Sequence, residues 1–288
     1  MLHDDASPLA GTEVHYLRSE HVGDEFKIFI GHCGVFGDEP PAVLYLTDAN
    51  GMFAGAVDII RSMQLSLHLP PILVVGIGYR LGGWAETTAV RTRDLSPTAD
   101  PLIGQILEGA DVAGMGGADR FIGFIRDELM PWVRSRYDVD ADDSTYFGHS
   151  LGGLFGTYTL LTQPTTFRKY GIGSPSLWWH DDIIFEYEAS YAAAHDDLPV
   201  KVFFSVGACE DHDGRQREAG RLPDEERVKA GLRYIDMTAD TERMVAALRA
   251  RRYPHLEIDG VVLADEFHIT VQHVNLSRSL RYLFDAPR

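Results

Sequence analysis

Cysteine, long apolar runs and basic residues are all scarce in this 288-residue sequence. Cys33 and Cys209 are too few for a disulfide framework, so we expect a reduced, cytoplasmic protein. No apolar run approaches the roughly 18 residues of a membrane span, and the first residues lack a signal-peptide pattern. The 26 basic residues against 43 acidic ones give a net charge of −17, which disfavours nucleic acid and anionic membranes as partners.

The sequence nevertheless contains enough apolar residues, 45%, to bury a large core. Without internal repeats, low-complexity blocks or a long Pro/Gly/Ser linker, it predicts a single domain over residues 1–288. The nearly unbroken apolar runs suit parallel strands covered by helices on both faces, and they lie at residues 42–47, 72–77, 200–206 and 256–263. Residues 14–18 and 26–31 predict an antiparallel N-terminal hairpin at the sheet edge, so we expect an α/β fold with a mostly parallel central sheet.

Helical spacing and turn residues divide the remaining chain. Helices are predicted at residues 55–67, 119–137 with a kink at Pro131, 223–251 and 270–284. The segments 79–118 and 208–240 are predicted to be loop-rich and to form the pocket or its cap above the strand ends. Within the first segment, residues 91–94 form either a pocket wall or an exposed, salt-bridged turn.

The stretch at residues 145–153, Thr-Tyr-Phe-Gly-His-Ser-Leu-Gly-Gly, predicts a nucleophilic serine. Its β-prone start, sharp turn and following helix form the strand, elbow and helix context that exposes a serine hydroxyl above a sheet. The strained turn requires small residues two before and two after Ser150, and Gly148 and Gly152 meet that demand. The helix start then offers the Leu151 N–H to a developing oxyanion.

A nucleophilic serine needs a histidine base, and the base needs a carboxylate to orient it. Among the 12 histidines, His268 stands in the loop after the last predicted strand and before a helix, so we predict it as the base. The loop after residues 200–206 supplies the acid: Glu210 is our first choice, with Asp211 and Asp213 as alternatives.

The turn after the first buried strand is the expected source of a second oxyanion donor. We predict the Asn50 N–H, with Gly51 as the next choice and an ordinary Asn-Gly turn as the alternative. Farther along, adjacent Trp178 and Trp179 follow a short predicted strand and cannot both point into one core layer. We predict substrate contacts from the set Trp178, Trp179, Arg93 and Tyr79, with simple helix-to-sheet packing as the alternative for the tryptophans.

Other motifs are rejected, so we expect no cofactor and no metal. Residues 74–78 lack the third glycine and the helix of a dinucleotide site. Residues 138–143 start like a calcium loop but lack its glycine and its final glutamate. The remaining candidate ligands are too crowded in sequence for a typical metal site: Cys209, Glu210, His212 and Asp213.

Four pieces in order carry a family resemblance, namely residues 148–153, 174–179, 207–210 and 266–268. Together they resemble the putative-esterase branch of the α/β-hydrolases, which includes esterase D-like enzymes, ferric-siderophore esterases and, more distantly, feruloyl esterases and mycolyltransferases. The resemblance spans nearly the full chain and implies an α/β-hydrolase fold with Ser150, Glu210 and His268 as triad and Asn50 and Leu151 as oxyanion donors. Ala49 departs from the glycine that relatives often have there.

The resemblance implies hydrolysis of a small-molecule carboxylic ester through an acyl-serine, with aryl, short-acyl or siderophore-type substrates. An anionic siderophore needs local positive charge, for which Arg80, Arg91 and Arg93 are candidates, whereas the net charge of −17 favours a neutral or aromatic ester. An acyltransferase, a peptidase and a non-catalytic binding protein with this fold are the alternatives. The sequence does not predict the acyl group, the alcohol or the oligomeric state.

Overall fold

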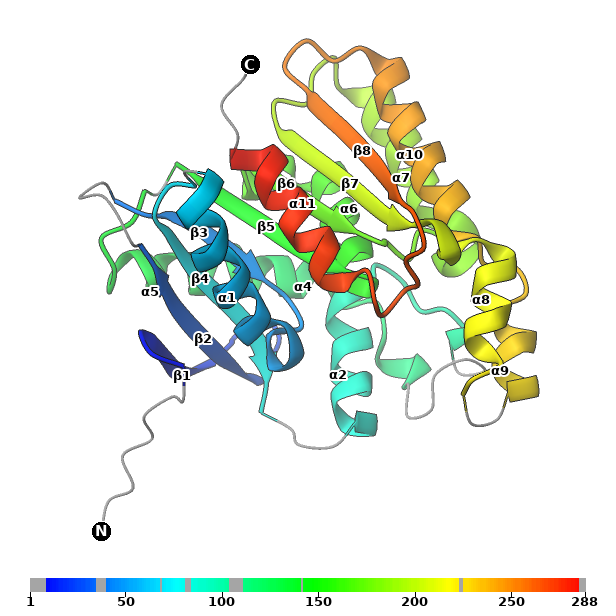
Figure 1. Cartoon of the computed structure of the whole chain (residues 1–288), viewed down its shortest axis with the longest axis horizontal. Helices are drawn as coiled ribbons and strands as arrows, with labels where there is room; N and C mark the ends of the chain where they lie inside the picture. The colour runs from blue at the N-terminus through cyan, green and yellow to red at the C-terminus, as the bar shows by residue number, and fades with distance from the viewer. Residues whose placement is uncertain are drawn as a thin grey trace.

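The strands form one eight-stranded sheet in the order β1-β2-β4-β3-β5-β6-β7-β8 (Figure 1). The computed structural model describes residues 9–34, 40–67, 69–80, 84–103, 111–140, 142–222 and 225–284. Its strands are β1 (Thr12–Arg18), β2 (Glu25–Cys33), β3 (Ala42–Leu46), β4 (Ile72–Tyr79), β5 (Ser144–His149), β6 (Lys169–Gly173), β7 (Lys201–Gly207) and β8 (Glu257–Leu263). The β1-β2 and β2-β4 pairs are antiparallel and all others are parallel, which confirms the predicted hairpin and the mostly parallel sheet.

Helices cover both faces of the sheet, as the apolar strands require. The helices are α1 (Ala49–Leu67), α2 (Trp84–Leu95), α4 (Ala118–Gly123), α5 (Met130–Arg134), α6 (Leu151–Thr162), α7 (Trp179–Ala194), α8 (His212–Ala219), α9 (Glu225–Leu232), α10 (Met237–Arg251) and α11 (Gln272–Phe284). Short turns η1 (Val112–Gly114), η3 (Pro164–Thr166) and η4 (Ala208–Glu210) and the π-helical η2 (Phe124–Leu129) complete the described elements. In Figure 1, α1 and α11 lie in front of the sheet, with α6 and α7 behind it.

Two apolar cores lie one on each face of the sheet, and a third, minor cluster joins the end of β7 to α8, α9 and the start of α10. The side chains of α1 and α11 pack with Leu44, Leu46 and Val74 in the smaller core. The larger core joins the other face of the strands to α4, α6, α7 and α10, and Tyr146 and Tyr170 are fully buried in it. Because both faces are covered, the carboxyl-terminal strand ends are the place where polar groups gather.

The predicted helix at residues 119–137 is interrupted by a π-helical segment instead of a simple kink. Pro131 lies in the first turn of α5, directly after η2. Proline has no N–H and its ring clashes with the carbonyl four residues earlier, and a wider π turn accommodates both effects. The structure therefore corrects the form of the disturbance while confirming that Pro131 causes one.

Other boundaries also differ from the predictions. The segment 79–118 is not loop throughout, because α2 occupies a stretch free of glycine and proline between the turn residues. The predicted helix at 223–251 is two helices, since Asp236 accepts a hydrogen bond from the Ala239 N–H and starts α10 anew. The helix expected from residue 55 already begins at Ala49, which places Asn50 and Gly51 in a helical turn rather than a loop.

Candidate active site

Ser150 occupies the sharp turn between β5 and α6, as the sequence predicted. Its φ of 63° and ψ of −119° lie in a strained region for a residue with a side chain. The backbone around it is held by hydrogen bonds: the Ser150 N–H donates to Gly173 O at 3.0 Å, and the Ser150 carbonyl accepts from the Leu154 and Ser176 N–H groups. These bonds hold the strained turn and fix the serine at the strand end.

Gly148 and Gly152 are required at this turn for steric reasons. A Cβ at Gly148 would lie 2.3 Å from the Tyr146 hydroxyl, and one at Gly152 would lie 2.6 Å from Thr47 Oγ1. The Tyr146 hydroxyl donates to the Gly152 carbonyl at 2.7 Å and also contacts Thr47. The end of β3 is thereby tied to the start of α6.

Three side chains from distant parts of the chain form a hydrogen-bonded row, which we call the Ser150 chain: Ser150, His268 and Glu210. Ser150 Oγ lies 3.0 Å from His268 Nε2, and His268 Nδ1 lies 2.5 Å from Glu210 Oε2. Glu210 is fully buried, while the imidazole is 11% exposed. The row has the order and the contacts that a serine nucleophile, a base and an orienting acid need.

Glu210 is held in its charged form. Burial raises its pKa, but the charge and hydrogen bond of His268, with further hydrogen bonds from Ser174 and the Gly207 N–H, outweigh burial and lower it. An ionised carboxylate only accepts hydrogen bonds, so His268 Nδ1 carries a proton in both charge states of the ring, and in the neutral imidazole Nε2 accepts from the Ser150 hydroxyl. Asp211, the first alternative, caps α8 by accepting from the Gly214 N–H.

The two predicted oxyanion donors lie at the starts of α6 and α1. Leu151 is the first residue of α6, and Asn50 lies in the first turn of α1, so both present N–H groups that have no partner within their own helix. The Asn50 side chain accepts from the Tyr79 N–H at 2.7 Å and donates to the Tyr79 carbonyl at 2.9 Å. It thereby anchors the start of α1 to the end of β4.

Arg91 from α2 links the residue that precedes α1 to the end of β5. Its guanidinium forms a two-pronged pair with Asp48, at 2.6 and 2.9 Å, and also contacts the His149 carbonyl at 3.4 Å. Asp48 has a φ of 57° and precedes α1 directly. Arg91 is therefore neither a free pocket cation nor part of an exposed turn, but a clamp between the ends of β3 and β5.

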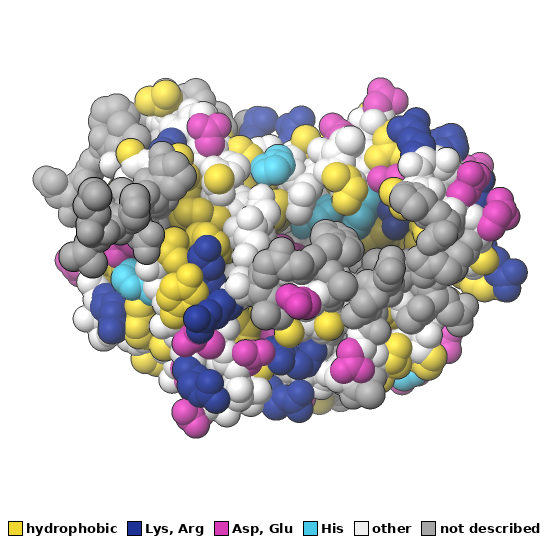
Figure 2. Space-filling view, turned by 90° about the horizontal axis from the view of Figure 1, so that it is seen from below, with side chains coloured by type: hydrophobic (Ala, Val, Ile, Leu, Met, Phe, Trp, Pro, Cys, Tyr) yellow, Lys and Arg dark blue, Asp and Glu magenta, His cyan; other side chains and the backbone are white. Residues whose placement is uncertain are grey.

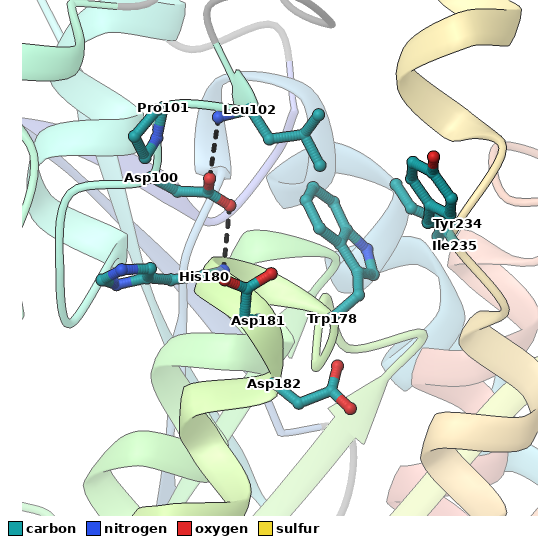
Figure 3. A pocket seen from close by; sticks show the side chains of 9 residues that line it. All are labelled: Asp100, Pro101, Leu102, Trp178, His180, Asp181, Asp182, Tyr234 and Ile235. Atoms are coloured by element: carbon teal, nitrogen blue, oxygen red, sulfur yellow. Dashed lines mark hydrogen bonds between the residues drawn. The ribbon is translucent and has the colours of Figure 1, made fainter.

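A cavity of about 380 Å³ lies beside Trp178, and we call it the Trp178 pocket (Figure 3). Its lining residues are Asp100, Pro101, Leu102, Trp178, His180, Asp181, Asp182, Tyr234 and Ile235. Figure 3 shows the indole of Trp178 between Leu102 and the Tyr234–Ile235 pair. Trp178 is two residues beyond Ser176, whose N–H donates to the Ser150 carbonyl at 3.2 Å. The Trp178 Cα therefore lies within roughly 12 Å of that carbonyl oxygen.

The other predicted substrate contacts lie elsewhere. Trp179 has 0% exposure and donates its indole N–H to the Thr98 carbonyl, so the prediction of a substrate contact is corrected for this residue. Tyr79 is 6% exposed, and Arg93 is paired with Asp24 and Asp94. One tryptophan faces a cavity and its neighbour the core, because side chains of adjacent residues leave the backbone in different directions.

Sequence reasoning missed two polar residues around Glu210. Ser174 donates to Glu210 Oε1 at 2.5 Å, and Asn275 donates to Ser174 Oγ at 2.9 Å. The position of Ser174 directly after β6 was a usable signal, since the ends of neighbouring parallel strands meet at one edge. Asn275 lies on the buried side of α11 and gave no signal that distinguishes it from a core residue.

Within the described residues, no group of three or more histidine, cysteine, aspartate or glutamate side chains is arranged to hold a metal ion. Cys33 and Cys209 are both free. Among the described helices, none is long and apolar enough to span a membrane.

Comparisons with known proteins agree on one family. The family described as "Putative esterase" matches residues 105–235. The ferri-bacillibactin esterase BesA of Bacillus subtilis is 30% identical over 96% of this chain and 91% of its own length. The siderophore triacetylfusarinine C esterase of Aspergillus fumigatus is 28% identical over 96% of this chain and 94% of its own.

A solved structure extends the likeness to the fold. The siderophore hydrolase EstB from Aspergillus nidulans superposes with a TM-score of 0.79 at 24% identity, covering 98% of both chains. The relatives are named as esterases, so they support neither the acyltransferase nor the non-catalytic alternative. The chain belongs to the putative esterase family of α/β-hydrolase fold, and it is a serine ester hydrolase.

Proposed function

We propose that Ser150 is the nucleophile, His268 the general base and Glu210 the residue that orients the imidazole. The observation that carries this assignment is the unbroken row of hydrogen bonds, 3.0 Å from Ser150 Oγ to His268 Nε2 and 2.5 Å from Nδ1 to Glu210. Such a base contributes about 10²–10⁴-fold to the rate.

The reaction runs in two steps. Ser150 Oγ attacks the ester carbonyl carbon while its proton passes to His268 Nε2, and the oxyanion is held by the Leu151 and Asn50 N–H groups. When the tetrahedral intermediate collapses, the C–O bond to the alcohol breaks and the departing alkoxide takes the proton from His268. Water then attacks the acyl-serine with His268 again as base, which releases the carboxylic acid and restores Ser150.

Labelling and mutation test this assignment together. A fluorophosphonate probe should modify Ser150 in the folded protein, and peptide mapping locates the label. Ser150→Ala should lose both labelling and turnover of an aryl ester while its circular dichroism stays unchanged. Retained turnover in Ser150→Ala would refute the assignment.

The substrate class that we propose is a siderophore ester, because the relatives with nearly full coverage are named for such substrates. The Trp178 pocket supports this by offering an aromatic wall in the segment that follows β6, the strand next to β5 in the sheet. The arginines expected to attract an anionic substrate are instead paired, Arg80 with Glu25 and Arg91 with Asp48. Arg221 is a better candidate, since its guanidinium lies 5.5 Å from the ring centroid of Phe267, the neighbour of His268.

Figure 2 shows a histidine side chain recessed in a hollow on the face seen from below. Because the Arg221 guanidinium lies over the ring of Phe267, the neighbour of His268, we expect Arg221→Gln to raise KM for an anionic siderophore ester several-fold and to leave a neutral aryl ester unaffected. The preference itself is tested by comparing kcat/KM for siderophore lactones and for p-nitrophenyl esters of graded length. A uniform preference for short aryl esters would contradict the siderophore assignment without affecting the proposed triad.

A cytoplasmic location stays part of this proposal, based on the low cysteine content and the two free thiols. Cell fractionation with an antibody to the protein tests it.

A further inference from the structure

The carboxylate of Glu210 has a second side-chain partner that lies outside the proposed triad. Ser174, in the loop after β6, is fully buried and places its hydroxyl 2.5 Å from Glu210 Oε1. The same oxygen accepts the Gly207 N–H at 2.8 Å, while Oε2 faces His268. Both carboxylate oxygens are thus held, and rotation of the carboxyl group would break at least two hydrogen bonds.

The direction of these bonds follows from the chemistry of the groups. The carboxylate can only accept, so the Ser174 hydroxyl proton points to Glu210. Ser174 Oγ must then accept from Asn275, which identifies the atom at 2.9 Å as the amide nitrogen. Asn275 is also fully buried, so this donor is withdrawn from water and directed at the serine.

Asn275 also contacts His149, whose ring lies beside the ring of His268. Asn275 Nδ2 lies 3.4 Å from His149 Nδ1, and the His149 ring lies 4.7 Å from the His268 ring at an angle of 33°. Burial, and then the nearby charges of His268 and Arg91, lower the pKa of His149 well below its usual range, so its ring is neutral. Among the described residues, the charged or titratable groups that act on this network include His268, His149, Glu210, Arg91 and Arg215.

Ser174 is held in an unusual backbone conformation. Its φ is 40°, its N–H donates to the Ser205 carbonyl at 2.6 Å, and the preceding Gly173 carbonyl accepts from the Ser150 N–H. A left-handed conformation costs a non-glycine residue of order 1 kcal/mol. Glycine would suit this backbone better, so the side chain of Ser174 has a use that offsets the strain.

We propose that Ser174, supported by Asn275, is a positioning residue for ester hydrolysis that holds the Glu210 carboxylate against the His268 imidazole. This inference rests on the proposed function, because it needs Glu210 and His268 in their catalytic roles. Ser174 does not touch the substrate and exchanges no proton with it; it acts through the carboxylate.

Ser174→Gly and Ser174→Ala separate the hydroxyl from the backbone strain. Both remove the hydrogen bond to Glu210, and we expect kcat to fall about tenfold to a hundredfold with little change in KM. The Ser174 hydroxyl also disperses part of the negative charge on Glu210, so its removal concentrates that charge near His268 and should move the acid limb of the kcat/KM profile to higher pH. Ser174→Gly relieves the strain, and its Tm should equal or exceed that of Ser174→Ala.

A double-mutant cycle with Glu210→Ala tests whether Ser174 acts through the carboxylate. Once Glu210 is absent, removing the Ser174 hydroxyl should change kcat less than about twofold, whereas independent roles would give multiplicative losses. Ser279→Ala is the matched control: Ser279 lies one turn from Asn275 on α11, is buried, and its hydroxyl has no partner among the described residues. This variant should keep the activity and the pH profile of the wild type.

The outcomes distinguish this inference from the function on which it rests. If Ser174→Gly is folded and keeps full activity with an unshifted acid limb, or if the cycle is multiplicative, the positioning role is overturned while the triad stands. If Ser150→Ala keeps its activity, the proposed triad fails and the inference with it. If Ser174→Ala fails to fold, Ser174→Gly and the double-mutant cycle built on it still test the positioning role of Ser174.

Discussion

The Ser150 chain and the Trp178 pocket lie at neighbouring strand ends but are built in opposite ways. In the first, the Glu210 side chain is buried and its oxygens bind Ser174, Gly207 and His268. In the second, Asp181 and Tyr234 are exposed, and Tyr234 is 70% exposed. The proposed reacting groups are thus held by hydrogen bonds, while part of the pocket wall is exposed to solvent.

This difference has a physical basis. Catalysis requires donors and acceptors that are already oriented when charge develops, so buried and fully bonded groups serve it best. Binding of a large ester needs apolar area and some freedom of the walls. The structure also stores strain on both sides: Ser150 and Ser174 have positive φ in the first region, and His180, Asp181 and Asp182 in the second.

The largest expected effect falls on the Ser150 chain. Glu210→Gln should lower kcat by on the order of 10³–10⁴-fold, because the amide no longer stabilises the imidazolium and no longer fixes its tautomer. KM for an aryl ester should hardly change, since Glu210 is buried away from the substrate. Steady-state kinetics with active-site titration measure kcat and KM of this variant. A change confined to KM would contradict the division of the site into a reacting region and a substrate-binding region.

An intermediate effect is expected in the Trp178 pocket. Trp178→Ala should raise KM for a siderophore ester about tenfold and leave kcat for an acetyl aryl ester within about twofold, because a short substrate does not reach the indole. Trp178→Phe serves as the matched variant that keeps an aromatic wall. Equal losses on both substrates would mean that Trp178 supports the reacting groups instead.

A smaller effect is expected one step farther from the histidine. Asn275→Ala should reduce kcat about threefold to tenfold, as expected for a neutral hydrogen bond that supports Ser174 indirectly. Its loss should be smaller than that of Ser174→Gly under the same conditions. If Asn275→Ala lowers kcat more than Ser174→Gly does while its Tm is unchanged, then Asn275 does not act only through Ser174.

The smallest expected effect concerns stability on the pocket side. Burial, with the nearby Asp182 and Asp236 charges, raises the pKa of Asp240 from 3.8 to about 7. Because the folded pKa exceeds the unfolded value, the wild type loses stability as the pH rises between these values. Asp240→Asn should therefore be more stable than the wild type at pH 8 by about 1 kcal/mol, after allowance for solvent screening, with no gain near pH 4.

Denaturant melts at both pH values measure this difference, and aryl ester turnover should be unaffected. A stabilisation that is equal at both pH values would show that packing, not charge, limits this part of α10.

Local sequence was sufficient for some of these features. The glycine spacing around Ser150 predicted the elbow, since the steric demand of the turn acts within five residues. The apolar runs predicted the parallel strands, and the position of His268 after the last strand predicted its approach to Ser150. The family resemblance, carried by four short motifs, is confirmed by the matched relatives.

Local sequence was not sufficient where neighbouring residues compete for one role. Glu210 and Asp211 both follow β7, and the structure directs Glu210 to His268 because Asp211 caps α8. Trp178 and Trp179 are likewise adjacent, yet only Trp179 is fully buried, with its indole N–H bonded to the Thr98 carbonyl. Helix boundaries at Pro131 and Asp236 also depended on details of hydrogen bonding that periodicity does not reveal.

By itself the sequence determined the sheet and the elbow and indicated the proposed reacting groups, because apolar period and steric limits act over short distances. Only the tertiary structure decided which carboxylate meets the histidine, which tryptophan borders a cavity, and that Ser174 and Asn275, 101 residues apart, support Glu210. Those choices depend on where separate strand ends and α11 come together. No local sequence pattern predicts these contacts, because burial and hydrogen bonds between distant parts of the fold select each partner.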